Sequence, residues 1–231
     1  MELKRTMELV EKSSLCRVRE EITNLNKLGR VYNIVQHPSI GPEYLDENVL
    51  VDSNAGKGFA QGGRMPNPEE PVLYWPKVIY NGSLTDLRTL VSDHNPGVVS
   101  LVFADSLEYG WVTAVNSDKG LLIGYIWKLP EYPWLSIWRN VLNGRPAARG
   151  LEFGTTGLHQ PYPVLVEKGT IFGRPLYEYI DAGQTVVKSY AMFLAKTPRG
   201  FTGVKDVRLR GDDIVITPLG ETTTEIVVRG R

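Results

Sequence analysis

The chain has 231 residues, and its 26 Lys and Arg are balanced by 26 Asp and Glu, so the formal net charge is zero. Duplex nucleic-acid binders gather a surplus of basic residues, and this chain has none, so we expect no nucleic-acid partner. A hydrophobic fraction of 42%, counted without glycine, is that of an ordinary globular protein and excludes disordered and collagen-like chains. At this length a single all-β domain is a reasonable expectation.

Cysteine usage and the N-terminal composition bear on the cellular location. The single Cys16 has no partner for an internal disulfide, and the first fifteen residues carry three Glu where a signal peptide needs an apolar core. No window approaches the roughly 18 apolar residues of a membrane span. We therefore expect a cytoplasmic location and no membrane partner.

The first residues show the only helical pattern. Leu3, Met7 and Val10 are spaced to share one face of a helix, so residues 1–12 are predicted to form a short helix or tail ahead of one domain spanning 13–231. Residues 15–23 and 29–37 are rich in β-formers and are joined by a segment with two Asn. That pattern predicts a hairpin.

The pattern weakens from 41 to 97, where Gly and Pro cluster at 53–71 and indicate a long surface excursion or a binding loop. Later strand patterns are separated by turn residues, and no amphipathic helix intervenes. This favours a β-sandwich or barrel over a βαβ fold, ending in a hairpin that turns at Pro218–Glu221. The predicted later strands are 98–104, 109–115, 121–128, 148–156, 162–167, 185–195, 204–209, 213–217 and 223–228.

Sequence motifs for phosphate loops, dinucleotide sites, zinc sites and nucleophile elbows are absent. The remaining candidates are three His, several carboxylates and five Trp. His37 is followed by Pro38, which favours an extended backbone at a strand-to-loop junction, where a side chain can face a cleft. A half-buried His that only ends a strand fits the same pattern.

Glu152 lies between Leu151 and Phe153, so strand alternation turns it away from their face. Gly150 and Gly154 remove bulk on either side of it, which suits the close approach of a ligand. A solvated, outward-facing Glu is the alternative.

Together, the two segments resemble the aldose 1-epimerase (galactose mutarotase) family. In ITNLNKLGRVYNIVQHPSIGPEYL, Asn33 and His37 stand at the places of the Asn-x-x-x-His that ends in the catalytic histidine. In GLEFGTTGLHQPYPVLVEKGTIF, Glu152 falls on the catalytic glutamate. The resemblance covers residues 20–40 and 145–200, and it is loose between them.

The resemblance implies an all-β, galactose mutarotase-like β-sandwich, or supersandwich, shortened at the N-terminus. It implies cofactor-independent interconversion of sugar anomers, with Glu152 as general base, His37 as general acid, no metal and a monosaccharide or sugar derivative as partner. Side chains of both types can change protonation state near neutral pH.

Further candidates for sugar contact are aromatic side chains, which pack on the apolar face of a ring, and polar neighbours of the acid and base. Trp127 and Trp134 are also candidates for sugar contact, although a Trp in a sandwich commonly lies in the core. His94 is a weaker candidate, because it lies in a polar turn. Alternation aims Gln36 and Arg149 at the face opposite their catalytic neighbours. The proposed substrate-binding residues are Asn33, Gln36, Trp75, Trp138, Arg149 and His159.

The sequence departs from the family before His37, where an Arg and a second His that hold the sugar have no counterpart, and neither Asp105 nor Asp118 clearly matches the family's mid-chain Asp. Two alternatives therefore stand beside the isomerase: a non-catalytic carbohydrate-binding sandwich and a structural interaction module. Uncovered strand edges recruit partners, so we also expect a homodimer through the N-terminal segment or an edge strand.

Overall fold

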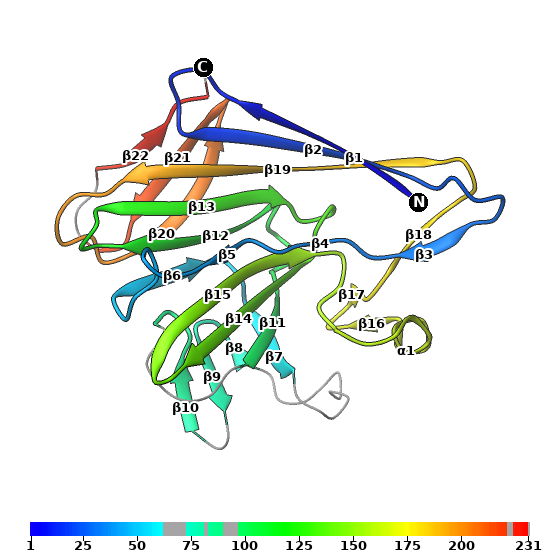
Figure 1. The fold of residues 1–231 in the computed structure, drawn as a ribbon, viewed down its shortest axis with the longest axis horizontal. Coiled ribbons are helices and arrows are strands. Elements are labelled where there is room, and N and C mark those ends of the chain that lie inside the picture. Colours follow the sequence, from blue (N-terminus) through cyan, green and yellow to red (C-terminus); the bar gives the residue numbers. More distant parts are fainter. Residues whose placement is uncertain (62–72, 81–82, 90–96, 221–223, 231) are drawn as a thin grey trace.

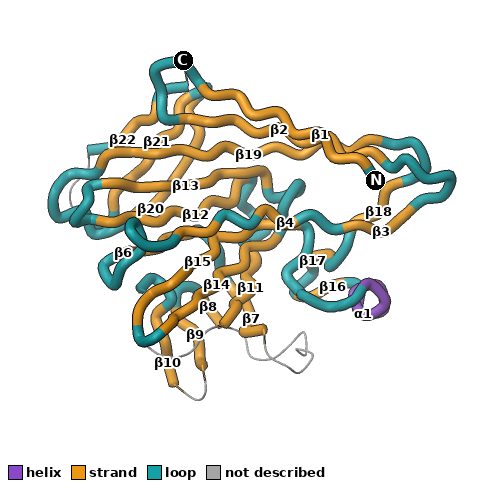
Figure 2. The backbone as a smooth tube through the Cα atoms, in the orientation of Figure 1, coloured by secondary structure: helices purple, strands orange, loops and turns teal. Residues whose placement is uncertain are grey.

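The computed structural model describes residues 1–61, 73–80, 83–89, 97–220 and 224–230 (Figure 1). This part of the chain is almost entirely β-strand, with a single short helix (Figure 2). The predicted all-β class is confirmed.

A six-stranded antiparallel sheet contains the long strands that cross the upper part of Figure 1. Its central strands carry apolar residues on both faces, because other sheets pack against both faces. From edge to edge its strands are β1 (Glu2–Leu9), β2 (Leu15–Thr23), β19 (Thr185–Lys196), β13 (Leu121–Lys128), β12 (Tyr109–Asn116) and β6 (Val49–Ser53).

A nine-stranded sheet lies against one face of the first. It runs through β10 (Ser83–Asp86), β9 (Lys77–Tyr80), β8 (Leu73–Tyr74), β7 (Lys57–Gln61), β11 (Gly97–Val102), β14 (Trp134–Leu142), β15 (Arg145–Gly154) and β4 (Val35–Gln36). The ninth strand, β5 (Ser39–Ile40), also pairs with β15.

The main core fills the space between these two sheets. Val112 and Trp127 of the first sheet meet Leu135, Leu151 and Phe153 of the second in one buried cluster. Trp127 and Phe153 stack with ring centroids 4.2 Å apart and an interplanar angle of 6°. This packing uses the odd-numbered residues of β15, so the even-numbered residues face away from the core.

A third sheet, β20 (Val204–Arg210), β21 (Asp213–Pro218) and β22 (Ile226–Val228), covers part of the other face of the six-stranded sheet. β21 and β22 pair antiparallel, which confirms the predicted C-terminal hairpin. Two small ribbons complete the described structure: β3 (Arg30–Tyr32) with β18 (Glu178–Ile180), and β16 (Thr170–Ile171) with β17 (Arg174–Pro175).

The helix expected within residues 1–12 is wrong, because residues 2–9 form strand β1. β1 pairs with β2 along its whole length, from Glu2 opposite Thr23 to Leu9 opposite Cys16. Leu3, Met7 and Leu9 all lie at odd-numbered positions, which is the spacing of one face of a strand. The predicted helix did not take this period of two into account.

Two other predicted elements are also wrong. Segment 29–37 is not one strand paired with β2: it divides into β3 and β4, and β2 pairs with β1 and β19 instead. The strand predicted at 162–167 is helix α1 (Tyr162–Lys168), with a Pro in its first turn and Gly169 at positive φ after its end. Both residues are ordinary helix boundary signals.

The weak region 41–97 holds strands β6 to β10, which the sequence analysis missed. Of the expected excursion at 53–71, residues 57–61 form β7, and the rest from 62 onward lies outside the described residues, as does His94. No helix among the described residues has the length and apolarity needed to cross a bilayer.

The stacked pair at the centre of the core gives a stability prediction. Phe153→Ala should lower the free energy of unfolding by about 3–5 kcal/mol, because it removes a buried ring and leaves a cavity against Trp127. Denaturant unfolding measures this. The matched control, Leu28→Ala at a side chain 77% exposed, should change it by less than about 0.5 kcal/mol. Equal effects of the two substitutions would contradict the role given to the stack.

Candidate functional site

The segment that carries β4 and β5 runs along the free edge of β15 (Figure 1). Gln36 lies opposite Phe153, and Ser39 lies opposite Gly150. The same register places His37 opposite Glu152. Directly opposed residues in antiparallel strands share a face, so both side chains lie on the face of the nine-stranded sheet that points away from the core.

The two side chains are in contact. His37 Nε2 lies 3.0 Å from Glu152 Oε1, and the imidazole is 58% exposed while the carboxyl group is only 2% exposed. The second carboxyl oxygen, Oε2, is buried and has no hydrogen-bond partner in the described structure. The sheet therefore holds a buried carboxyl group with one oxygen beneath an accessible imidazole and the other buried without a hydrogen-bond partner in the described structure.

Burial sets the protonation behaviour of Glu152. Removal from water disfavours the charged form and raises the pKa of the carboxyl group, while the nearby His37 opposes this by favouring the carboxylate. Burial is the larger cause, so the pKa of Glu152 lies above its usual range. A carboxyl group of this kind exchanges its proton closer to neutral pH than an exposed one.

The other ring nitrogen of His37 is also held. Nδ1 lies 3.0 Å from Ser39 Oγ, two residues along the chain. When Nε2 donates to the carboxylate, Nδ1 of a neutral ring accepts a hydrogen bond from the Ser39 hydroxyl, whereas a charged ring donates at both nitrogens. The Trp138 ring lies beside the imidazole, with centroids 6.0 Å apart.

A row of small polar side chains continues from Glu152 across the sheet. Ser136 lies opposite Glu152, and Ser100 lies opposite Ser136, with 3.2 Å between the two hydroxyl oxygens. Gln61 Nε2 donates to Ser100 Oγ at 2.7 Å. Both serines are buried on the sheet face opposite the core. Ser39, Gln61, Ser100 and Ser136 were not predicted as site residues from the sequence, and it is strand pairing that brings them onto the face of Glu152.

His159 adjoins this row. Its backbone N–H donates to Gln61 Oε1 at 3.2 Å. The pKa of its imidazole is lowered, first by burial and second by the charge of His37. Trp138 and His159 are thus the two proposed substrate-binding residues that the structure places near the His37–Glu152 pair.

Four other proposed contact residues are directed elsewhere. Gln36 points into the core side and donates to Glu20 Oε2 at 2.7 Å. Arg149 is fully buried on the core face, where burial and the charge of Arg139 lower the pKa of its guanidinium. Both follow the alternation expected from the sequence.

Asn33 and Trp75 also have structural roles. Asn33 Nδ2 donates to the Leu176 carbonyl at 3.1 Å, and its side-chain oxygen accepts from Thr155. Trp75 packs against the main core, while Trp127 and Trp134 are fully buried. Among the residues the structure describes, no three His, Cys, Asp or Glu side chains gather closely enough to hold a metal ion.

Several solved structures share this architecture. A candidate aldose 1-epimerase from Klebsiella pneumoniae superposes with a TM-score of 0.63 at 15% identity, over 84% of this chain and 47% of that one. A galactose mutarotase-like protein from Clostridium acetobutylicum gives 0.56 at 15% identity, over 79% and 53%. A TPR-domain containing protein from Parabacteroides distasonis gives 0.54 at 10% identity, over 90% and 33%.

These likenesses define the class of fold. The chain has the galactose mutarotase-like β-sandwich, and it spans about half the length of the mutarotase-like proteins just named. No protein-family model and no curated protein matches the sequence. The third neighbour is named for its TPR domain, so a similar fold occurs in proteins of more than one kind.

The raised pKa of Glu152 predicts a specific dependence of stability on pH. The folded state holds this proton more tightly than the unfolded chain, so the free energy of unfolding falls as pH rises from the ordinary carboxyl range through the raised pKa. Glu152→Gln removes that fall. Because Gln cannot ionise, the variant avoids the cost of burying the charged form, and its stability relative to the parent should increase as pH rises to 7–8.

Thermal or denaturant unfolding from pH 4 to pH 8 measures the effect, and the difference should shrink toward acid pH. Glu11→Gln removes the same charge at a side chain that is 88% exposed, and it should leave the profile unchanged. A Glu152→Gln variant with the parent's pH profile would contradict the raised pKa.

Proposed function

We propose that the protein is a cofactor-independent isomerase of the aldose 1-epimerase type, which interconverts the α and β anomers of a sugar. The observation that carries the proposal is the contact between the buried Glu152 carboxyl group and the accessible His37 imidazole on an outward-facing sheet surface. The names of the mutarotase-like neighbours point to the same chemistry.

The closeness of the two groups fits the reaction. Anomer exchange removes a proton from the C1 hydroxyl and adds one to the ring oxygen, and both oxygens are bonded to C1. An acid and a base that serve one hemiacetal carbon must therefore lie within a few ångströms of each other. The separation of 3.0 Å between His37 and Glu152 meets this requirement.

Each group has a defined task. The Glu152 carboxylate accepts the C1 hydroxyl proton, while protonated His37 donates from Nε2 to the ring oxygen. The C1–O bond of the ring breaks and leaves an open-chain aldehyde. After rotation about C1–C2, neutral His37 takes the proton from the C5 hydroxyl, and protonated Glu152 returns one to the carbonyl oxygen.

Neighbouring residues give the pair its setting. Ser39 orients the imidazole, and the Trp138 ring offers an apolar surface for the C–H face of a sugar. Ser136 and Gln61 lie on the same face, where Gln61 is held by hydrogen bonds to Ser100 and to the backbone N–H of His159.

The direct test is anomer exchange on a panel of aldoses, followed by polarimetry or by magnetisation transfer between anomeric protons. The wild-type protein should accelerate exchange for at least one sugar, and Glu152→Gln and His37→Asn should each lower kcat by at least about 100-fold. The matched control Glu11→Gln should retain the full rate. Full activity in both site variants would show that the acid and base are wrongly assigned.

A second function is favoured by the same contact. His37 and Glu152 already satisfy each other, and the chain spans about half of its mutarotase-like neighbours, so the domain could bind sugar without converting it. Calorimetric titration separates the two functions: a sugar that binds, and loses affinity in Trp138→Ala, while exchange stays at the uncatalysed rate identifies a binding module.

The isomerase proposal predicts a bell-shaped dependence of rate on pH. The rate rises with pH as Glu152 loses its proton. Because burial raises the pKa of Glu152, this rise should occur at higher pH than it would for an exposed carboxyl group. The general acid must carry its proton to act, so the rate falls again at higher pH. A flat profile between pH 4.5 and pH 9 would contradict this acid–base pair.

A further inference from the structure

Strand β1 forms one edge of the six-stranded sheet, and all eight of its residues are exposed. One long edge pairs with β2, and no strand in the described part of the chain pairs with the other. A long strand with a free edge is a template for pairing with another chain.

One face of β1 carries three apolar side chains and Arg5, which binds the buried Glu20. Leu3 and Met7 are 49% and 58% exposed, and Leu9 is 79% exposed. They continue the inner face of the sheet from Ile22 and Val18 of β2, beyond the part that the second sheet covers. Edge strands of monomeric proteins are usually short or protected by charge. At eight residues β1 is long for an edge strand, and because its charges have both signs they can pair with those of a second copy.

We propose that the protein forms a two-fold symmetric dimer in which β1 pairs antiparallel with β1 of a second copy, joining the two six-stranded sheets into one. The charges of the strand select the register. With Thr6 opposite Thr6, Lys4, which also lies 3.6 Å from Glu21 Oε2 of its own chain, faces Glu8 of the second copy in two symmetric pairs, and Leu3 lies opposite Leu9.

A register shifted toward the N-terminus fits less well. A shift that centres the two-fold axis on Arg5 opposes Arg5 to Arg5 and Glu2 to Glu8, and like charges directly opposite are destabilising. A register shifted by one residue on only one of the two strands would place the apolar face of one strand beside the polar face of the other. The register centred on Arg5 would also bring together two Arg5 side chains that are already bound to Glu20 and Gln36.

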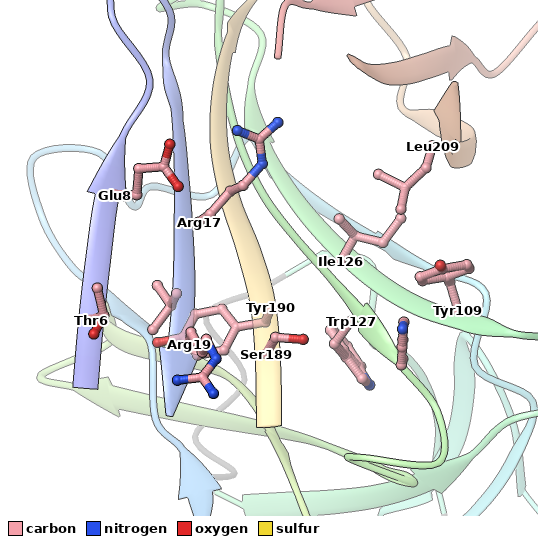
Figure 3. Close-up of a pocket in the computed structure, with 12 residues that line it drawn as sticks. Thr6, Glu8, Arg17, Arg19, Tyr109, Ile126, Trp127, Ser189, Tyr190 and Leu209 are labelled. Atoms are coloured by element: carbon pink, nitrogen blue, oxygen red, sulfur yellow. The ribbon is translucent and has the colours of Figure 1, made fainter. Parts of the chain in front are cut away.

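The dimer extends an existing groove. A groove of about 390 Å³ on the outer face of the six-stranded sheet runs from Thr6 and Glu8 of β1 past Arg17 and Arg19 to Leu209 of β20 (Figure 3). In the proposed register, Lys4 and Thr6 of the second copy lie next to its β1 side. In the dimer the groove therefore continues across the two-fold axis, and Lys4 of the second copy adds a positive charge to its wall.

The first test measures association by sedimentation. The full chain should be dimeric at tens of micromolar, and Glu8→Lys, which sets lysine against Lys4 twice, should raise Kd by roughly tenfold to a hundredfold. The double variant Lys4→Glu, Glu8→Lys restores opposite charges and should restore the dimer. Glu11→Lys, with the same charge change just beyond the strand, is the control.

The second test fixes the register. Thr6→Cys places a thiol opposite its own copy, where the Cα separation of about 4.5–5.5 Å in an antiparallel pair suits a disulfide. Mild oxidation should cross-link this variant, and Met7→Cys should cross-link far less, because Met7 faces Arg5 of the second copy. The parent chain has only the buried Cys16 and should not cross-link.

Three outcomes would overturn the proposal: a monomer at about 100 μM, equal weakening by Glu8→Lys and Glu11→Lys, or equal cross-linking of the two cysteine variants. Anomer exchange is not used in either test, so the proposed dimer and the proposed function fail separately.

Discussion

The buried carboxylate of Glu20 joins the parts of the chain that position the site. It accepts hydrogen bonds from Arg5 of β1, from Gln36 Nε2 at 2.7 Å and from the Tyr132 hydroxyl at 2.8 Å, so it links strands β1, β2 and β4 and the connection between β13 and β14. A buried carboxylate without such partners would be strongly destabilising. Because Glu20 holds Gln36 inward, strand alternation turns His37 outward onto Glu152.

Part of this arrangement could be predicted from the sequence. Alternation around Glu152 correctly separates it from Leu151 and Phe153, and the same rule places Gln36 and Arg149 on the core side. The all-β class and the C-terminal hairpin follow from short strands divided by turn residues. Local periodicity is sufficient for these conclusions because each concerns neighbouring residues.

The missed features depend on contacts between distant segments. The apolar spacing in β1 fits a helix as well as a strand until its partner β2 is known. Ser100 and Ser136 are ordinary strand residues in isolation, and only the pairing of β11, β14 and β15 aligns them with Glu152. The contact of Ser39 with His37 was within reach of the sequence, since the two residues are only two positions apart.

The pairing of β2 with β19 has a consequence for synthesis of the protein. Thr23 and Thr185 meet across this pair although 162 residues separate them. At about 5–20 residues per second, a ribosome needs roughly ten to thirty seconds to make the intervening chain. During that time β1 and β2 can form only a hairpin, with Val18 and Ile22 uncovered by the sheets that later bury them. The nascent chain is therefore a natural client for chaperones that shield apolar hairpins until β19 has left the exit tunnel.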